Sequence, residues 1–323
     1  MFKRIKEGIR MQWGQIKTLF ILCFLILDIF LLRQYIDNQQ EELSYNTEET
    51  TQEDYLATNL KGLDNIPEEP TKAATLNAKS KEFTEEEISE IDKLPNQKSV
   101  IIDDTMIVSH FDSPEAFDLD TTKESIKENI WNDEQYNLED YVVDEQTNTY
   151  IFFQELDDPI YYNLSGVLMI KVNENGEMTH YVQTILEKTE EQPVEELIMP
   201  LTVITKLFNN GNISPGSEIT EVDLGYHNLL PLPNGEQVLL PTWEIEVDDN
   251  TYFYINAVEG HNSNREAHDF VMEMKNLIGE SVGTSAIQPL EEDWGQTEIN
   301  HFINQVLAEL MSTREVEEED DAL

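Results

Sequence analysis

The 323-residue sequence has few basic residues and almost no cysteine. It holds 20 Lys and Arg against 66 Asp and Glu, which gives a formal net charge of -46. Binding to DNA or RNA needs clustered positive side chains against the phosphates, so we expect no nucleic-acid partner. The single cysteine, Cys23, excludes an internal disulfide framework and any site built from several thiolates.

Motifs that carry chemistry are also missing from the sequence. None of the six histidines forms an H-E-x-x-H pair, and no serine lies in G-x-S-x-G or in S-x-x-K with a matching K-T-G. Glycine-rich phosphate loops, a nicotinamide fingerprint and the calcium loop D-x-[DN]-x-[DN]-G are absent as well. We therefore predict no catalytic residue, no metal site and no cofactor, and a protein that is not an enzyme. A hydrolase with an unrecognised site is the weakest alternative.

The longest apolar stretch lies near the N-terminus. Residues 18–32, TLFILCFLILDIFLL, would form about 22 Å of helix, and extension to the interfacial aromatics Trp13 and Tyr35 gives a segment 13–36 of about 36 Å, enough to cross a bilayer. A cleaved signal peptide is the alternative, but no small-residue cleavage site follows. We therefore predict an uncleaved transmembrane signal anchor that contacts the lipid bilayer through one helix.

The charges that flank this segment predict its orientation. Five basic residues precede the apolar run at 18–32, and only Arg33 follows it closely. The excess of positive charge marks the cytoplasmic side, so residues 1–12 are expected in the cytoplasm and the chain from Gln34 onward outside the cell. The predicted location is the cell membrane, with a single pass.

Asp28 is the one carboxylate inside the predicted anchor. A charge at that depth is costly, so the side chain either snorkels or stays protonated near the outer interface, or it contacts another transmembrane helix. We favour the contact with another transmembrane helix. Together with Trp13 and Tyr35, Asp28 makes up our predicted transmembrane interaction site.

Beyond the anchor, the pattern of apolar residues predicts an α+β fold, with antiparallel sheet and packed helices. Ordered structure is expected to begin near Phe83, after a polar and acidic stalk at 37–82. We expect a first small α/β part at 83–138 and a β-rich sheet domain at 139–264. A C-terminal helical extension at 265–311 and a disordered acidic tail at 312–323 complete the predicted order.

Local patterns give specific expectations within these parts. Thr84 and Glu87 have the spacing of a capping box, which predicts the start of a helix. Asn173–Gly176 is predicted to form a hairpin loop, and residues 199–211 a helix that ends at Asn210-Gly211. A turn at Asp248–Asn250 joins two strands whose alternating apolar and aromatic residues we predict to form the sheet core: Trp243, Ile245, Val247, Tyr252 and Tyr254.

Two segments carry a resemblance to a known family. M-x-W-x-x-x-K-T at Met11–Thr18 leads into FLILDIFLLRQY at Phe24–Tyr35, and LLPTWEIEVDDNTYFYINAVEG occupies Leu239–Gly260. The chain resembles the YycI family over roughly 11–262. That resemblance implies a non-enzymatic membrane regulator of WalK (YycG), the cell-wall-homeostasis sensor kinase of the WalK–WalR (YycG–YycF) two-component system of Gram-positive bacteria.

The resemblance implies two protein partners, the kinase WalK (YycG) and a YycH-like sister protein, contacted partly through transmembrane helices. Whether the chain represses or activates the kinase does not follow from it. The alternative is a membrane-tethered binding or inhibitor module for a cell-wall enzyme.

The sequence departs from the family pattern at both ends. Residues 1–10 are extra, and Lys6-Glu7-Gly8 is compatible with the codons AAG-GAG-GGN of a ribosome-binding sequence, so we expect translation to begin at Met11. The region after about Arg265 is longer than the family pattern.

Overall fold

The computed structural model describes residues 17, 20–29, 31–32, 49–117, 122–231, 236–263, 265–310 and 312. The chain divides into two compact units, residues 1–59 and 60–323. Within the first unit, residues 20–29 and 31–32 are helical, and α2 spans Glu49–Asn59. Among the described residues, no helix is both long enough and apolar enough to cross a membrane.

The second unit contains both helices and strands. In chain order they are η1 (Leu63–Asn65), β1 (Lys72–Ser80), α3 (Glu85–Ile91), β2 (Gln97–Ile102), β3 (Met106–Ala116), α4 (Thr122–Asn129), η2 (Asp133–Gln135), β4 (Val142–Asp144), β5 (Thr149–Glu155), β6 (Pro159–Ile160), β7 (Val167–Val172), β8 (Glu177–Thr184), β9 (Leu186–Glu196), α5 (Pro200–Asn209), β10 (Ile219–Pro231), β11 (Glu236–Val247), β12 (Thr251–Asn256), α6 (Ala267–Ser281), β13 (Ile287–Pro289) and α7 (Gln296–Leu310).

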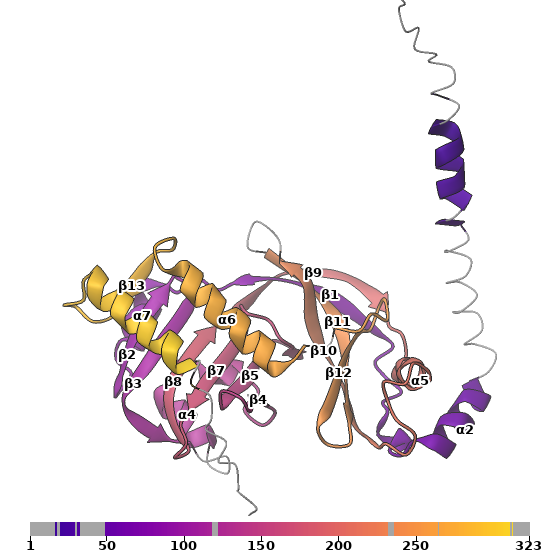
Figure 1. Ribbon diagram of the computed structural model, residues 1–323, viewed down its shortest axis with the longest axis horizontal. Helices are drawn as coiled ribbons and strands as arrows, with labels where there is room; N and C mark the ends of the chain where they lie inside the picture. The colour runs from indigo at the N-terminus through magenta and orange to yellow at the C-terminus, as the bar shows by residue number, and fades with distance from the viewer. Residues whose placement is uncertain are drawn as a thin grey trace, which may run out of the picture. The chain divides into compact units, whose positions relative to one another are not determined.

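The strands of this unit join in one largely antiparallel sheet with the order β13-β2-β3-β8-β7-β5-β6-β10-β11-β1-β9. In addition, β4 pairs with β5, and β12 pairs with β11. We call β13-β2-β3-β8-β7-β5 with β4 the first lobe, and β6-β10-β11-β1-β9 with β12 the second lobe (Figure 1). The fold is therefore a mixed α+β fold dominated by an antiparallel sheet.

The first lobe is covered by helices on both faces (Figure 1). Val108, Met169 and Val182 pack in one apolar cluster with residues of α6 and α7. Their chain neighbours Ile107 and Leu168 belong to a second cluster with residues of α3 and α4. Successive side chains of a strand point to opposite faces, so burial of both faces explains why strands such as β7 are apolar almost throughout.

The second lobe has a clearer distinction between its faces. Trp243, Ile245 and Val247 of β11 alternate onto one face, and all three are buried. The Trp243 ring Nε1–H donates a hydrogen bond of 2.8 Å to the Ile198 carbonyl, in the segment that leads into α5. The other face of β11 carries Glu244 and Glu246.

Several local expectations are confirmed. The Thr84 side chain accepts from the Glu87 backbone, and the Glu87 carboxylate accepts from the Thr84 backbone, which completes the capping box at α3. The helix expected at 199–211 is α5, and Gly211 beyond its end has φ +76°. The hairpin loop at Asn173–Gly176 joins β7 to β8.

The expectation that ordered structure begins near Phe83 is wrong. Strand β1, which lies inside the expected stalk at 37–82, pairs with both β11 and β9. Its inward positions include Ala78 as well as Leu76, and most of its remaining residues are small or polar, so the strand lacks a clear apolar alternation. Pairing with a strand on each side therefore stabilises β1 as a strand, although its own sequence pattern does not predict one.

The expected boundary near residue 138 does not separate two parts of the fold. β3, which lies in the expected first part at 83–138, pairs with β8 of the expected sheet domain at 139–264. β13, inside the expected helical extension at 265–311, pairs with β2. These pairings join residues far apart in the sequence, so no local sequence pattern predicts them.

Candidate functional site

The predicted transmembrane residues fall at the edge of what the structure covers. Trp13 and Tyr35 lie outside the described residues. Asp28 lies in the helical segment 20–29, and its side chain is exposed, as are those of its apolar neighbours. The transmembrane interaction site therefore stays a prediction.

The structure places the five predicted sheet residues on two different faces. Trp243, Ile245 and Val247 share the face described above, whereas Tyr252 and Tyr254 of β12 lie opposite Glu246 and Glu244. Tyr254 is buried and Tyr252 is half-buried. The tyrosines thus belong with the glutamates rather than with Trp243.

Carboxylates gather on this second face of the second lobe. Asp223 of β10 pairs with Glu244 of β11, and Glu221 pairs with Glu246. Asp140, from the loop before β4, raises the pKa of Glu244 through its charge and therefore lies close to it. We call these five residues, Asp140, Glu221, Asp223, Glu244 and Glu246, the acidic face.

The acidic face runs from solvent into the interior. Asp140, Glu221 and Asp223 are exposed and Glu246 is half-buried, but Glu244 is only 8% exposed. Burial raises the pKa of Glu244 to about 8, and the neighbouring charges of Asp140 and Asp223 act in the same direction. Glu244 is therefore largely protonated at neutral pH.

Aromatic rings enclose the buried end of this face. The Tyr161 and Tyr254 rings lie 4.9 Å apart, and Tyr162 connects Tyr254 to Phe270 of α6, with 5.2 Å between centroids in each pair. The Tyr161 ring lies against Gly225 of β10, where an added Cβ would be 2.3 Å from Cε2. A glycine is needed there because any side chain would displace the ring.

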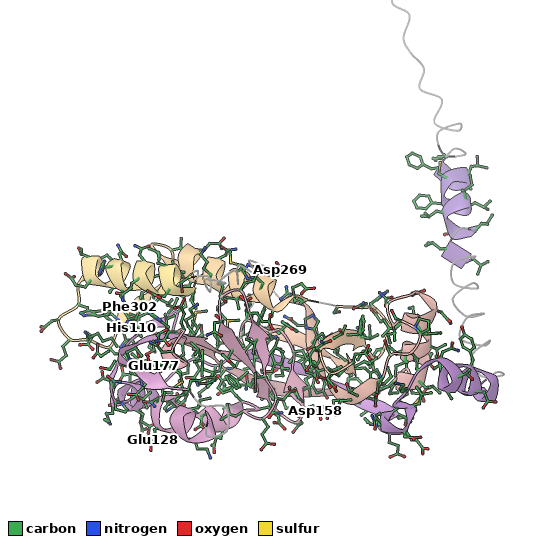
Figure 2. All side chains as sticks on the ribbon, turned by 60° about the horizontal axis from the view of Figure 1, so that its bottom comes forward. His110, Glu128, Asp158, Glu177, Asp269 and Phe302 are labelled. Carbon is green, nitrogen blue, oxygen red and sulfur yellow. The ribbon has the colours of Figure 1, made fainter. Side chains whose placement is uncertain are left out.

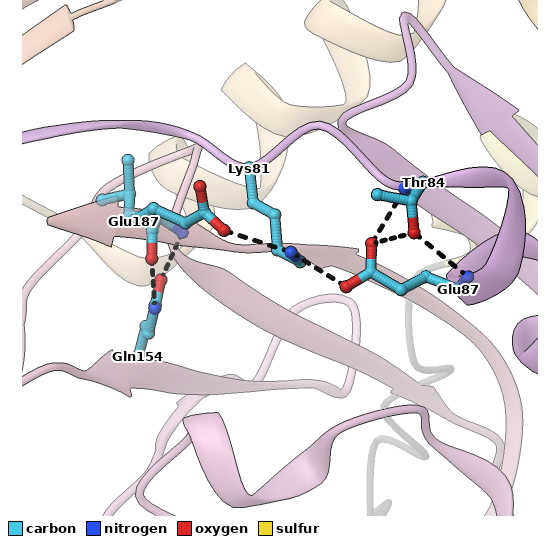
Figure 3. Close-up of polar contacts among 6 residues, drawn as sticks. Lys81, Thr84, Glu87, Gln154 and Glu187 are labelled. Carbon is cyan, nitrogen blue, oxygen red and sulfur yellow. Dashed lines mark hydrogen bonds and ion pairs between the residues drawn. The ribbon is translucent and has the colours of Figure 1, made fainter. Parts of the chain in front are cut away.

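A second polar cluster lies where the two lobes meet (Figure 3). The Lys81 Nζ, just after β1, lies 2.9 Å from Glu87 of α3 and 3.1 Å from Glu187 of β9. Beside it, the Gln154 side chain of β5 bonds both backbone groups of Leu186, at 2.9 and 2.7 Å. These contacts connect the first lobe to the second, so the cluster is structural in character.

A groove of about 400 Å³ separates part of α7 from the first lobe. His110, His301, Trp294 and Phe302 line it, and Figure 2 shows His110 and Phe302 close together. The His110 ring packs edge-on against buried His180, with 4.5 Å between centroids. Across the part of the chain that the structure describes, no three His, Cys, Asp or Glu side chains are placed to hold a metal ion.

Sequence reasoning missed the acidic face. The alternation of Trp243, Ile245 and Val247 with Glu244 and Glu246 predicts glutamates that point to solvent, and Glu244 is buried instead. The acidic residues come together only through the register between neighbouring strands. The sequence of one strand does not show which strand it pairs with, so this arrangement could not be predicted from it.

Comparison with known proteins places the chain beside a protein family. The family model described as YycI protein matches residues 38–258 of the chain. No protein with a curated description matches. Among solved structures, an uncharacterized protein from Eubacterium rectale ATCC 33656 is similar over 64% of this chain and 89% of its own, with 13% identity and a TM-score of 0.38.

Proposed function

This chain belongs to the YycI family, a family of regulatory proteins associated with the WalK system, and from that premise we propose that it regulates a WalK-type sensor histidine kinase without being an enzyme itself. The observation that carries the proposal is the family match, which extends over most of the chain from residue 38 to residue 258. It covers most of both lobes of the sheet.

The proposed regulator is held in the cell membrane by the segment 13–36, with its lobes outside the cell. The apolar run at 18–32 and the five basic residues before it support this arrangement. Asp28 would then lie in a bundle with helices of the kinase and of a YycH-like protein, where a hydrogen bond between helices offsets the cost of a polar group in lipid.

Regulation would work as a population shift. A protein that binds one conformation of the kinase better than another biases its output by the difference in the two binding free energies. Contacts at both the membrane helix and the lobes would contribute to that difference. Whichever conformation is bound more tightly decides whether the effect is activation or repression.

Co-purification from native membranes in mild detergent tests the proposal. We expect the wild-type chain to recover a WalK-type kinase and a YycH-like protein, and Asp28→Leu to recover less of both. Asp28→Asn is the matched control, because the amide keeps a hydrogen-bonding group in the helix, and it should retain recovery near the wild-type amount.

Two results would contradict parts of the proposal. Equal recovery with Asp28→Leu and wild type would remove the membrane helix from the contact while keeping the kinase as a partner. Recovery of cell-wall enzymes with no kinase would overturn the regulatory function and favour a tethered inhibitor.

A further inference from the structure

The acidic face is costly as the structure stands. Like charges directly opposite each other in a sheet are destabilising, and Glu221 faces Glu246 in this way. Asp223 faces Glu244, which keeps its proton at neutral pH because of burial and the charges around it. Ion pairs among the described residues involve carboxylates elsewhere, and none includes a member of the acidic face. Such a concentration of unpaired acids in one sheet face needs an explanation.

A buried hydroxyl group points to the same place. Tyr161 is fully buried, and its hydroxyl lies next to the Glu244 carboxyl without a hydrogen bond of normal geometry to any described residue. The charges of Glu244, Asp223 and Asp140 all raise its pKa, so the hydroxyl lies beside the acidic face. An unpaired buried hydroxyl costs free energy unless something completes its hydrogen bonding.

We propose that the acidic face is a docking site for a cationic side chain, an arginine or lysine, carried by a protein partner. The inference rests on the proposed function for the identity of that partner, an extracytoplasmic segment of the kinase or of the YycH-like protein. A cation there would offset the repulsion between the Glu221 and Glu246 carboxylates and would favour the ionised form of Glu244. Relief of these costs would add to the affinity for the partner.

The geometry favours a long side chain over a bare metal ion. The carboxylates are spread from the exposed rim at Asp140 and Asp223 to buried Glu244, and no three of the described ligand-type side chains converge as a metal would require. A lysine or arginine side chain is long and has an apolar stem, so it can extend from the exposed carboxylates toward the buried one. At the rim, two ordered donors already hold Glu246, because the Tyr252 hydroxyl and the Thr220 hydroxyl donate to its two oxygens at 2.8 and 2.9 Å.

The aromatic surroundings suit the same ligand. Tyr252 and Tyr254 lie one strand away from the glutamates, within the same face of the sheet. Tyrosine rings attract ammonium and guanidinium groups through the negative charge of their faces. A guanidinium would donate several hydrogen bonds at once to neighbouring carboxylates, which makes arginine the stronger candidate.

The test compares two variants of the full chain in detergent, each of which loses one aspartate and one glutamate charge. Asp223→Asn/Glu246→Gln removes charge from the acidic face, whereas Glu292→Gln/Asp293→Asn removes it from exposed positions between β13 and α7. Isothermal titration calorimetry at about 150 mM salt, with a decapeptide of alternating Arg and Gly as the probe, measures affinity for each. We expect a loss of about tenfold or more for the first variant and less than about twofold for the second.

A stability measurement checks the same inference without any ligand. If the face is strained when empty, Asp223→Asn/Glu246→Gln should raise Tm by about 2–4 °C, while the control variant should leave it within about 1 °C. Equal loss of peptide affinity in both variants, or a Tm lowered by the first, would overturn the proposal. A larger Tm increase from Ca²⁺ than from the peptide, lost in the first variant, would overturn it in favour of a metal site.

Co-purification then tests the docking site separately from the proposed regulatory function. If the wild-type chain recovers no kinase, the proposed function fails while the peptide titration still decides whether a cation site exists. If wild type and Asp223→Asn/Glu246→Gln recover equal amounts of kinase and YycH-like protein, the function stands and the docking site is overturned.

Discussion

The two faces of strand β11 differ sharply in chemistry. One face holds Trp243, Ile245 and Val247 in an apolar core, and the other holds a protonated Glu244 among carboxylates and tyrosines. The first face is built for stability, since all three of these side chains are buried. The second places the carboxylates of Glu221 and Glu246 opposite each other and keeps Glu244 in a buried position, both at a cost to stability.

The largest effect should come from the apolar face. Trp243→Ala removes a fully buried ring and its hydrogen bond to Ile198, so we expect the free energy of unfolding to fall by about 3–5 kcal/mol. Urea unfolding followed by circular dichroism measures this. A loss below about 1 kcal/mol would show that the second lobe does not depend on this core.

Glu244→Gln should change how the stability of the protein depends on pH. The folded-state pKa of Glu244, about 8, is above the ordinary value of 4.5, so its protonated form favours folding at low pH and that contribution is lost as pH rises from about 4.5 through 8. The wild type should therefore lose on the order of a few kcal/mol of stability across this window, and Glu244→Gln should lose less. Parallel pH profiles of the two chains would contradict the assignment.

Gly225→Ala tests the close approach beneath Tyr161. An added Cβ would lie 2.3 Å from the ring and 2.6 Å from the Pro159 carbonyl, so we expect destabilisation by about 1–3 kcal/mol. Gly279→Ala is the matched control, because its Cβ would meet nothing nearer than 3.8 Å and the residue lies within α6. That change should stabilise the protein by about 0.5–1 kcal/mol, as Ala replaces Gly inside a helix.

The smallest effect should come from the contact between the lobes. Lys81→Met removes the amine that joins Glu87 and Glu187, and we expect a loss of about 1 kcal/mol in urea unfolding. Lys72→Met breaks the more exposed pair with Glu196 and should cost less than about 0.5 kcal/mol. If both variants lose the same amount, the partly buried position of Lys81 adds nothing to the pair.

Much of the local structure was predictable from short-range pattern. The turn after Val247 is one example: Asp248 and Asp249 have φ values of 56° and 59°, a conformation that aspartate tolerates better than most residues. Helix α7 is another, since the spacing of Ile299, Phe302 and Ile303 identified its buried face. These features depend on residues within a few positions of one another.

The candidate site was not predictable in that way. Glu244 alternates with apolar neighbours as a surface residue would, and Tyr161 follows a strand of only two residues. Tyr161 reaches the site through a parallel contact between β6 and β10, which joins positions more than sixty residues apart, and β10 then pairs with β11. Strand β1 went unrecognised for the same reason.

The amino-acid sequence by itself determined the acidic character of the protein, the apolar segment at 18–32, the positions of several helices and hairpins, and the resemblance to the YycI family, because each of these depends on composition or on short-range spacing. Only the tertiary structure decided which strands are neighbours. That choice places Asp223 opposite Glu244 and brings Tyr161 beside them. The free energy of such a site depends on burial and on the charges of adjacent strands, and neither exists until the sheet has formed.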